Sequence, residues 1–450
     1  MKDTQSTGDA FKQRLDALGA THVHVSMVDA EAEFRNKLIS AEKAIGLAKK
    51  GYAFCEILYF WDIAEEPFIY NTFADRPAAL DASSIRAYPF SENTAFCLAD
   101  FSGEFGNLSP RNQCLKQIAR AGELGFDVFS AFEVEFIVFD ETAESMRAKN
   151  YENLTHLAEG NRTYSIPTMA EHQELMLGLV DMLKVMEVEP DALHTELGPG
   201  FFELPIAYSA GIKAADDAAI FKNFARAYFA RHKKTVGFMS RYSDDLPGQS
   251  AHLHISLRDK QGTPVFFDAE GEQGLSKTAR HFIGGVLKYL PEMLVLSAHT
   301  VNAYKRLVPS SWAPVSASWG AQNRTAAVRV IGDTPDSTRL EFRVPSADTN
   351  PYTALTFLIA AGLEGIEKEI SAPPISDESA YHAEPDPAHR FPQNLGEAID
   401  RMKTSDAARR LFGDDFVDTF LNIRRHEWQC YQAYLNQISP WEKQRFLGVV

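Results

Sequence analysis

The sequence predicts a chain that mixes helices and strands, either α/β or α+β. Hydrophobic residues make up 45% of its 450 residues, which is enough for a sizeable core and too many for a disordered protein. Strand-like and helix-like segments alternate beyond residue 106. Several strand-like segments carry ionisable residues on one face and apolar residues on the other. The first observation indicates a folded chain with a core, the second indicates the mixed fold, and the third indicates where a functional site lies.

The first hundred residues combine a helical stretch with strand-like segments at 22–29, 51–61 and 94–101. A helix is then expected after Ser109 as N-cap, with Pro110 at its first position and an end at Gly125. We place a domain boundary just before this helix. Residues 1–106 would form a small first domain and residues 107–450 a large second one.

Beyond this boundary, a strand over 130–140 precedes a polar loop over 141–166. A helix is expected to begin at Thr168, where Glu171 completes a capping box. From residue 395 onward the chain is expected to be mainly helical. The elements expected in between are strands at 192–197, 236–242, 250–257, 325–331 and 337–344, and helices at 214–234, 276–290 and after Asn350 and Pro351.

Composition argues against several classes of protein. The formal charge is −16 with a pI near 5.3, whereas nucleic-acid binding favours basic surfaces. The polar start does not resemble a signal peptide, and the longest apolar run, from Tyr352, is too short to span a bilayer. We therefore expect a soluble, cytoplasmic protein without a nucleic-acid or membrane partner. No CxxC pattern is present among the four cysteines, which are Cys55, Cys97, Cys114 and Cys430.

Three strand-like segments place charged groups on one face. In the first, Glu133 and Glu135 oppose an apolar face that includes Val134. Two later segments repeat this pattern, with His252, His254 and Ser256 in one and Arg339, Glu341 and Arg343 in the other. An ordinary half-exposed antiparallel sheet is the alternative interpretation. Such a sheet, however, usually exposes Lys, Thr and Ser rather than Glu, His and Arg.

If helices cover the apolar faces, the charged faces could line one cavity. Glu196 and Glu203, at either end of a Gly-Pro-Gly turn, would add to Glu133, Glu135 and Glu341. Five carboxylates cannot stay ionised together without cations. Oxygen ligands with one imidazole, from His252, favour two or more Mg²⁺ or Mn²⁺ ions.

Arginines are clustered in the second half of the chain. Arginine is the planar, permanently charged partner of carboxylate and phosphate, and some of these residues are expected to pair with structural acids instead. Metals beside arginines indicate phosphoryl transfer, although the chain has neither a Walker A loop nor a kinase Gly-rich loop. The residues concerned are Arg306, Arg324, Arg329, Arg339 and Arg343.

These residues lie in motifs that resemble the glutamine synthetase family. The motifs follow the family's order over most of residues 105–360, and the C-terminal helices are similar too. The resemblance implies an α+β fold, with a small N-terminal β-grasp-like domain and a large catalytic domain in which helices flank a curved antiparallel sheet. It also implies a homo-oligomer, typically a dodecamer of two hexameric rings with active sites between neighbouring subunits. The motifs are EVE, HTELGPGFFELP, GQSAHLHIS, NAYKRLVP, NRTAAVRV and RLEFRVP.

By resemblance, the chemistry is ATP-dependent activation of the glutamate side chain to an acyl phosphate, followed by attack of an amine. One metal site would use Glu135, Glu196 and Glu203, and the other Glu133, His252 and Glu341. Glutamate would contact Gly248, Arg306 and Arg343. ATP and its phosphates would lie near His254, Ser256, Arg329 and Arg339, with Arg324 and Arg343 acting in catalysis.

The departures from the family's motifs fall at the amine end. Where the family usually has KRLVPGYEAP, with a flap glutamate that closes the ammonium site, this chain has KRLVPSSWAP with Trp312 in that place. Phe201 replaces the glutamine of the family's GPGQ, and Pro247 replaces an asparagine. An apolar wall favours an amine with an organic group over ammonium. Drift of the flap, or an inactive relative, is the alternative.

Asp62 is our candidate for the aspartate that a neighbouring subunit supplies to the amine site in this family, although such an aspartate is often only a turn former. We therefore expect a γ-glutamyl-amine ligase acting on glutamate, an organic amine and ATP. The alternatives are a glutamine synthetase that uses ammonium, a ligase with another carboxylate donor, and a non-catalytic ring-forming relative. The sequence does not identify the amine, the metal or the size of the ring.

Overall fold

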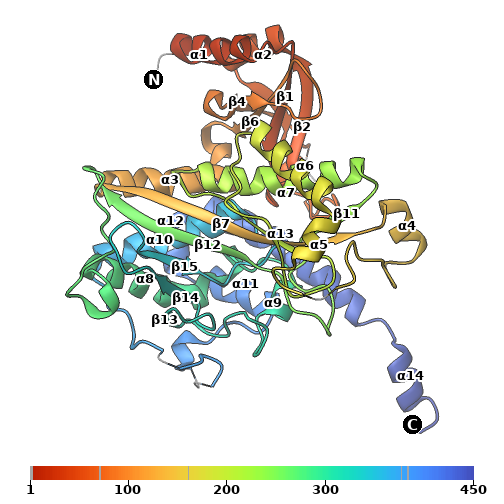
Figure 1. Ribbon diagram of the computed structural model, residues 1–450, viewed down its shortest axis with the longest axis vertical. Helices are drawn as coiled ribbons and strands as arrows, with labels where there is room; N and C mark the ends of the chain where they lie inside the picture. Colours follow the sequence, from red (N-terminus) through yellow and green to blue (C-terminus); the bar gives the residue numbers. More distant parts are fainter. Residues whose placement is uncertain (1–3, 70–71, 161, 377, 383–384, 450) are drawn as a thin grey trace.

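The structure is a computed structural model that describes residues 4–69, 72–160, 162–376, 378–382 and 385–449 (Figure 1). Two sheets organise the chain, a smaller one near the N-terminus and a larger one in the body of the molecule (Figure 1). The predicted α+β fold is confirmed. In the part of the chain that the structure describes, no helix combines the length and hydrophobicity needed to cross a membrane.

The smaller sheet has six strands in the order β2-β1-β6-β4-β3, with β5 pairing to β6. The pair β1–β6 is parallel and the other pairs are antiparallel. The strand expected over 51–61 stops at Cys55, where the 3-10 helix η1 (Glu56–Tyr59) begins. The strands are β1 (His22–Val28), β2 (Phe34–Ser40), β3 (Tyr52–Cys55), β4 (Asp75–Leu80), β5 (Arg86–Ala87) and β6 (Thr94–Phe101), with α1 (Thr4–Ala17) and α2 (Ala41–Ala48) beside them.

The larger sheet has nine strands, and its path runs β13-β14-β15-β12-β7-β9-β8, with β10 and β11 also pairing to β7. All pairs are antiparallel except β13–β14. The long strands β7 and β12 cross the body of the molecule (Figure 1). The strands are β7 (Phe126–Phe139), β8 (His194–Thr195), β9 (Phe201–Pro205), β10 (Ser209–Ala210), β11 (Thr235–Gly237), β12 (Ala251–Asp259), β13 (Trp319–Ala321), β14 (Val328–Ile331) and β15 (Arg339–Phe342).

Helices cover the apolar face of this sheet. Phe132, Val134 and Phe136 of β7 are buried in the main core with Phe221 of α7 (Lys213–Arg231). The helices α3 (Pro110–Glu123), α8 (Lys277–Met293) and α10 (Pro351–Glu367) pack together in the same core. A Cβ atom on Gly285 would lie 2.1 Å from the carbonyl oxygen of Ala361, so glycine allows α8 and α10 to approach at backbone distance.

Two helix predictions are corrected. The helix expected to start at Thr168 begins earlier, as α5 (Ile166–Glu171), because Ser165 is the N-cap and its hydroxyl accepts from the backbone N–H of Thr168. The chain then breaks at His172, and α6 (Gln173–Val185) follows. The predicted loop over 141–166 contains α4 (Ala143–Ala148), which Thr142 and Ser145 cap reciprocally.

The predicted C-terminal helices are confirmed. The last of them extends away from the rest of the chain (Figure 1). They are α11 (Leu395–Lys403), α12 (Asp406–Phe412), α13 (Asp414–Leu435) and α14 (Pro440–Phe446). The short elements elsewhere are α9 (Ala303–Arg306), η2 (Ala82–Ser84), η3 (Gly103–Leu108), η4 (Glu272–Gly274), η5 (Leu294–Leu296) and η6 (Pro387–His389).

A buried ionic network joins the smaller sheet to the helices. The guanidinium of Arg111, on α3, donates to Asp100 of β6 and to Asp216 of α7, each at 2.8 Å. The Ser109 hydroxyl caps α3 and also donates to Asp100, while the Tyr352 hydroxyl donates to Asp216. Burial raises the pKa of Asp100, and Arg111 opposes that shift. These contacts lie close to residue 106, and a division into domains there stays a prediction.

Replacing Arg111 with methionine is expected to lower the free energy of unfolding by about 3–5 kcal/mol, because it leaves two carboxylates buried without their cation. The matched control is Lys260→Ala, which removes an exposed ion pair with Asp127 and is expected to cost less than about 1 kcal/mol. Urea unfolding of both variants measures the difference. Equal losses in the two variants would show that the Arg111 network contributes no more than a surface pair.

Candidate active site

A cavity of about 390 Å³ lies on the charged face of the larger sheet. All six residues predicted to bind metal line it, so the strand faces predicted from alternation do meet in space. Other predicted site residues also line this cavity, namely Phe201, Gly248, Arg306, Trp312, Arg324, Arg329 and Arg343. The cavity is therefore where the predicted metal, substrate and arginine positions converge.

The register of the central strands brings the carboxylates together. Glu133 of β7 lies opposite His252 of β12, and Glu135 lies opposite Glu203 of β9. Glu341 of β15 lies opposite His254. Because facing residues on adjacent strands point to the same side, three strand pairings suffice to group these side chains.

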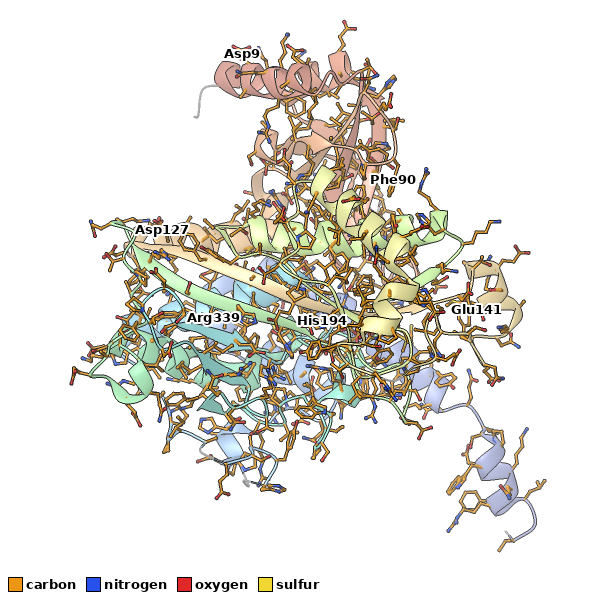
Figure 2. All side chains as sticks on the ribbon, in the orientation of Figure 1. Asp9, Phe90, Asp127, Glu141, His194 and Arg339 are labelled. Carbon is orange, nitrogen blue, oxygen red and sulfur yellow. The ribbon has the colours of Figure 1, made fainter. Side chains whose placement is uncertain are left out.

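One end of the cavity gathers Glu135, Glu196 and Glu203, with His194 between the last two. The imidazole of His194 lies 3.5 Å from Glu196 through Nδ1 and 3.5 Å from Glu203 through Nε2. Figure 2 labels His194 near the lower end of α5. The backbone N–H of Ser250 donates to Glu135 Oε2 at 2.6 Å. Sequence reasoning missed His194, although it stands two residues before Glu196 in a strand-like segment and so shares its face.

The other end gathers Glu133, His252, His254 and Glu341. Nδ1 of His252 lies 3.4 Å from Glu341 Oε1 and 3.6 Å from Glu133 Oε2. Nε2 of His254 lies 3.1 Å from Glu133 Oε1. Ligand atoms of Glu133, Glu203 and His252 lie within 4.8 Å of one another, so the two ends are continuous.

The carboxylates perturb each other's protonation. Burial and then the charges of neighbouring glutamates raise the pKa of Glu203, and burial raises the pKa of Glu135. Burial also opposes ionisation of Glu133, but His252 and His254 outweigh it and hold the pKa of Glu133 well below its usual range. Burial, followed by the charge of Arg343, lowers the pKa of His252 to about 4, so this imidazole is neutral at neutral pH.

These residues fit divalent cations. Nε2 of His252 is buried and has no hydrogen-bond partner among the described residues. The charges of neighbouring glutamates add to burial in raising the pKa of Glu203, so a cation between these carboxylates would relieve their repulsion. Carboxylate oxygens with a neutral imidazole are a donor set that Mg²⁺ and Mn²⁺ accept.

Two arginines hold Glu341 in place. Nη1 of Arg329 donates to Glu341 Oε2 at 2.9 Å, and Arg343 pairs with the other carboxylate oxygen. Arg343 also donates to the backbone carbonyls of Arg324, at 3.0 Å, and Trp312, at 3.2 Å. The acid that Arg329 and Arg343 contact is thus a predicted metal ligand and not a structural acid outside the cavity.

The remaining arginines differ in how they are held. Arg306 is 2% exposed and donates to the carbonyl oxygen of Val344 at 3.0 Å. A Cβ atom on Gly248 would lie 2.7 Å from Cγ of Arg306, so glycine makes room for this side chain. Arg324 is exposed, and its guanidinium donates no hydrogen bond to any described residue. Arg324 is therefore the arginine most available to an anion in the cavity.

A second hollow of about 340 Å³ adjoins the first and shares Glu133 with it. It contains the other predicted nucleotide residues, His254, Ser256 and Arg339. Nε of Arg339 donates to Nδ1 of His254 at 3.2 Å, and Figure 2 labels Arg339 further along the sheet from His194. Phe129, whose ring lies 5.5 Å from the guanidinium carbon of Arg258, gives this hollow an aromatic wall.

Trp312 and Phe201, the two aromatic residues that replace residues of the family's motifs, lie in different environments. Trp312 stands at the edge of the cavity with 59% of its surface exposed. Phe201 lines the cavity but is buried, and it packs with Ile137 and Phe139. Its neighbour Phe202 points to the opposite side of the sheet, into the main core. Trp312 is therefore the more accessible of the two aromatic residues at the cavity.

Asp62 does not line the cavity of its own chain. Its Oδ1 atom accepts from the backbone N–H groups of Ala64 and Glu66, each at 2.9 Å, as a turn-forming aspartate does. Its Oδ2 atom faces His426 at 3.4 Å. A role at the amine site of a neighbouring subunit stays a prediction.

The chain resembles known proteins in family, sequence and fold. Residues 107–446 match the model of the glutamine synthetase catalytic domain. A type-1 glutamine synthetase 2 of Dictyostelium discoideum is 32% identical, with 95% of this chain and 84% of that protein covered. A glutamate–isopropylamine ligase of a Pseudomonas species is 31% identical, with 95% of each chain covered.

A γ-glutamylethanolamide synthetase of Streptomyces coelicolor is 34% identical, with 84% of this chain and 79% of that protein covered. Among solved structures, the ligand-free form of GmaS superposes with a TM-score of 0.84 at 25% identity, covering 97% of this chain and 99% of that one. The relatives therefore include a protein named as a glutamine synthetase and proteins named for products of organic amines.

Raising the pH from about 5 to about 8 is expected to lower the melting temperature of the metal-free protein. The folded-state pKa values of Glu135 and Glu203 lie above the ordinary value of 4.5, so the folded state binds more protons than the unfolded state in this range and loses stability as they dissociate. Mg²⁺ should restore more stability at the higher pH. Thermal melts with and without Mg²⁺ measure both effects.

The matched variants are Glu203→Gln and, as control, Glu270→Gln on the surface. The first should flatten the pH dependence and weaken the response to Mg²⁺, while the second should change neither. A wild-type slope in Glu203→Gln would contradict the electrostatic account of this cluster.

Proposed function

This chain belongs to the glutamine synthetase family, whose members are ATP-dependent ligases, and we propose that it joins the γ-carboxylate of glutamate to an organic amine. The products would be a γ-glutamylamide, ADP and phosphate. The observation that carries this proposal is Trp312 at the edge of the cavity, where the family's motif has a flap glutamate. Relatives named for isopropylamine and ethanolamide products support it.

In the first step, a γ-carboxylate oxygen of glutamate attacks the γ-phosphorus of ATP, ADP leaves, and γ-glutamyl phosphate forms. In the second, the amine nitrogen attacks the activated carbonyl, loses a proton, and phosphate leaves. Divalent cations held by Glu133, Glu135, Glu196, Glu203, His252 and Glu341 would neutralise phosphate charge throughout.

We assign glutamate to the part of the cavity near Gly248 and Arg306. Arg306 is buried and fixed to the backbone, so it offers a positive charge that does not move. Burial lowers the pKa of Arg306 to about 10, which still leaves it charged at neutral pH. A carboxylate is the complementary ligand for such a group.

We assign ATP to the adjoining hollow, with its phosphates toward Glu133, which both spaces share together with Pro205. His254, Ser256 and Arg339 would contact the nucleotide, and Arg329 its phosphates. Arg324 would bind the transferring phosphoryl group, since its guanidinium makes no hydrogen bond to the described residues. Arg343 would add positive charge while it positions Glu341.

The acceptor end favours an organic amine on physical grounds. Tryptophan offers a large apolar face and no acceptor for a proton, whereas ammonium gains nothing from apolar contact. Burying one or a few methylene groups against such a wall is worth about 1–3 kcal/mol. Phe201 contributes less than the sequence suggested, because its ring is largely committed to packing with Ile137 and Phe139.

Glutamine synthesis from ammonium is the second candidate, favoured by the similar identity of the Dictyostelium glutamine synthetase. For assembly, we propose the family's arrangement of two hexameric rings, because family members are oligomeric and their sites lie between subunits. A carboxylate donor other than glutamate, and a non-catalytic ring-forming relative, are further alternatives.

Phosphate release with ATP, Mg²⁺ and glutamate is expected to be fast with an organic amine and slow with ammonium. The panel is ammonium, short alkylamines, ethanolamine, putrescine and aniline, with product masses checked. Turnover with ammonium alone would make this protein a glutamine synthetase. No turnover with any amine would point to another carboxylate donor, tested next, or to a non-catalytic relative.

Trp312→Glu is expected to shift the ratio of kcat/KM values, organic amine over ammonium, toward ammonium by about 10-fold or more. The substitution removes the apolar wall and supplies a carboxylate for the ammonium proton. Trp312→Phe is the matched control, because it keeps an aromatic surface and should keep the preference. A ratio unchanged in Trp312→Glu would exclude this residue as the selector of the amine.

A further inference from the structure

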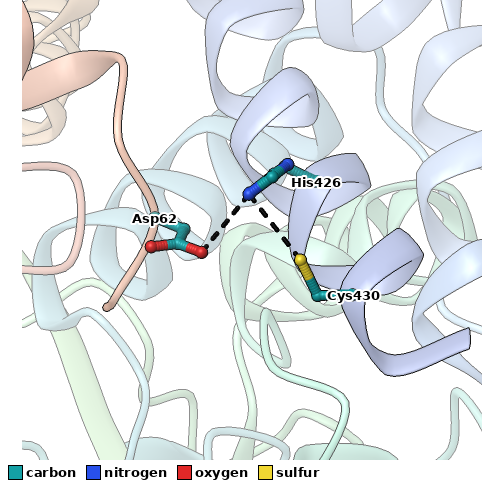
Figure 3. Close-up of side chains that lie close together, drawn as sticks. All are labelled: Asp62, His426 and Cys430. Atoms are coloured by element: carbon teal, nitrogen blue, oxygen red, sulfur yellow. Dashed lines mark hydrogen bonds and ion pairs between the residues drawn. The ribbon is translucent and has the colours of Figure 1, made fainter. Parts of the chain in front are cut away.

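A second group of potential ligands lies outside the cavity, where the loop after η1 meets α13 (Figure 3). Nε2 of His426 lies 3.4 Å from Asp62 Oδ2 and 3.7 Å from Cys430 Sγ. The three ligand atoms all lie within 4.8 Å of one another. We propose that Asp62, His426 and Cys430 form a binding site for one zinc-class transition-metal ion.

The local structure presents these three side chains to one another. His426 and Cys430 are four residues apart on α13, so they share one face of the helix, next to the buried Ile423, which precedes them by three and seven residues. Two backbone N–H groups fix Oδ1 of Asp62, which leaves Oδ2 directed at His426. The ring of Phe68 packs 5.6 Å from the imidazole and limits its rotation.

The spacing of the atoms suits a tetrahedral ion. Metal–ligand bonds of about 2.0–2.1 Å to nitrogen, 2.0–2.2 Å to oxygen and 2.3 Å to sulfur place ligands about 3.4 Å (N to O) and about 3.6 Å (N to S) apart. The observed separations are 3.4 and 3.7 Å. One nitrogen of His426 thus lies at coordination spacing from both a carboxylate oxygen and a thiol sulfur.

The donor set selects the class of metal. One carboxylate oxygen, one imidazole nitrogen and one thiolate suit zinc and related ions, whereas the carboxylate-rich cavity suits Mg²⁺ or Mn²⁺. Three protein ligands leave a fourth position for water or another small ligand. Binding converts the Cys430 thiol to thiolate and releases its proton to solvent.

The site has a structural consequence. An ion held there would tie the loop at residues 61–67, which leads out of the smaller sheet, to the long helix α13. It would also occupy Oδ2 of Asp62, the one carboxylate atom that backbone N–H groups leave open. An ion bound to Oδ2 and a contact of Oδ2 with the amine of a neighbouring subunit would therefore exclude each other, and the second role stays a prediction.

Cobalt(II) binding tests the proposal without reference to ligase activity. The full-length protein is treated with a chelator and then given excess Mg²⁺, so that the carboxylate cavity is already filled. Cobalt(II) is titrated while the thiolate-to-cobalt charge-transfer absorption is followed, and zinc is then added to displace it. Wild type should give this absorption at one equivalent per chain. Its absence would overturn the proposal.

Variants locate the ligands. Cys430→Ser should abolish the absorption, and His426→Ala should weaken cobalt affinity at least about 100-fold. Cys55→Ser is the matched control and should retain the wild-type signal, since the Cys55 thiol already donates to the carbonyl oxygen of Phe73 and belongs to no ligand group among the described residues. An absorption that persists in Cys430→Ser, or unchanged affinity in His426→Ala, would overturn the site. Far-ultraviolet circular dichroism of each metal-free variant confirms that it is folded.

Discussion

Repulsion between carboxylates on one face of the larger sheet is the constraint on which the rest of the structure depends. Strand pairing sets Glu133, Glu135 and Glu203 side by side, and burial prevents water from screening their charges. The apolar backs of the same strands, anchored in the main core, keep this arrangement folded. The arrangement trades stability for affinity, since a well-packed apolar face would be more stable but could not bind a cation.

The arginines around the cavity are of two kinds: some are fixed by hydrogen bonds to the protein, and one is available to a ligand. Arg329 and Arg343 hold Glu341, and Arg306 is fixed to backbone carbonyls. These bonds orient the charged groups before any ligand arrives, so little reorganisation is needed on binding. Arg324 makes no such bond within the described residues and is left for an anion. Preorganisation of most of the arginines thus leaves one free to respond.

Alternation along single strands made the charged cavity predictable from sequence, because side chains in a strand point to opposite faces whatever the tertiary context. Pairings between strands were not predictable in this way, which is why the partners of each arginine emerged only from the structure. Local signals failed where two of them competed: Ser165 and Thr168 both suit a helix N-cap, and Ser165 is the one whose hydroxyl caps α5. The surroundings of Asp62 depend on α13, more than 350 residues away in the chain.

The bond from Arg343 to residue 312 has a consequence for divergence within the family. The acceptor is the backbone carbonyl of Trp312, an atom that every amino acid possesses. The side chain at this position can therefore change without loss of the hydrogen bond that supports the flap, although its positive φ of 59° slightly favours glycine and asparagine. With the role that we propose for Trp312, support and substrate selection would be carried by different atoms of one residue. A single codon change would then alter which amine is chosen while the residues proposed for phosphoryl transfer stay unchanged.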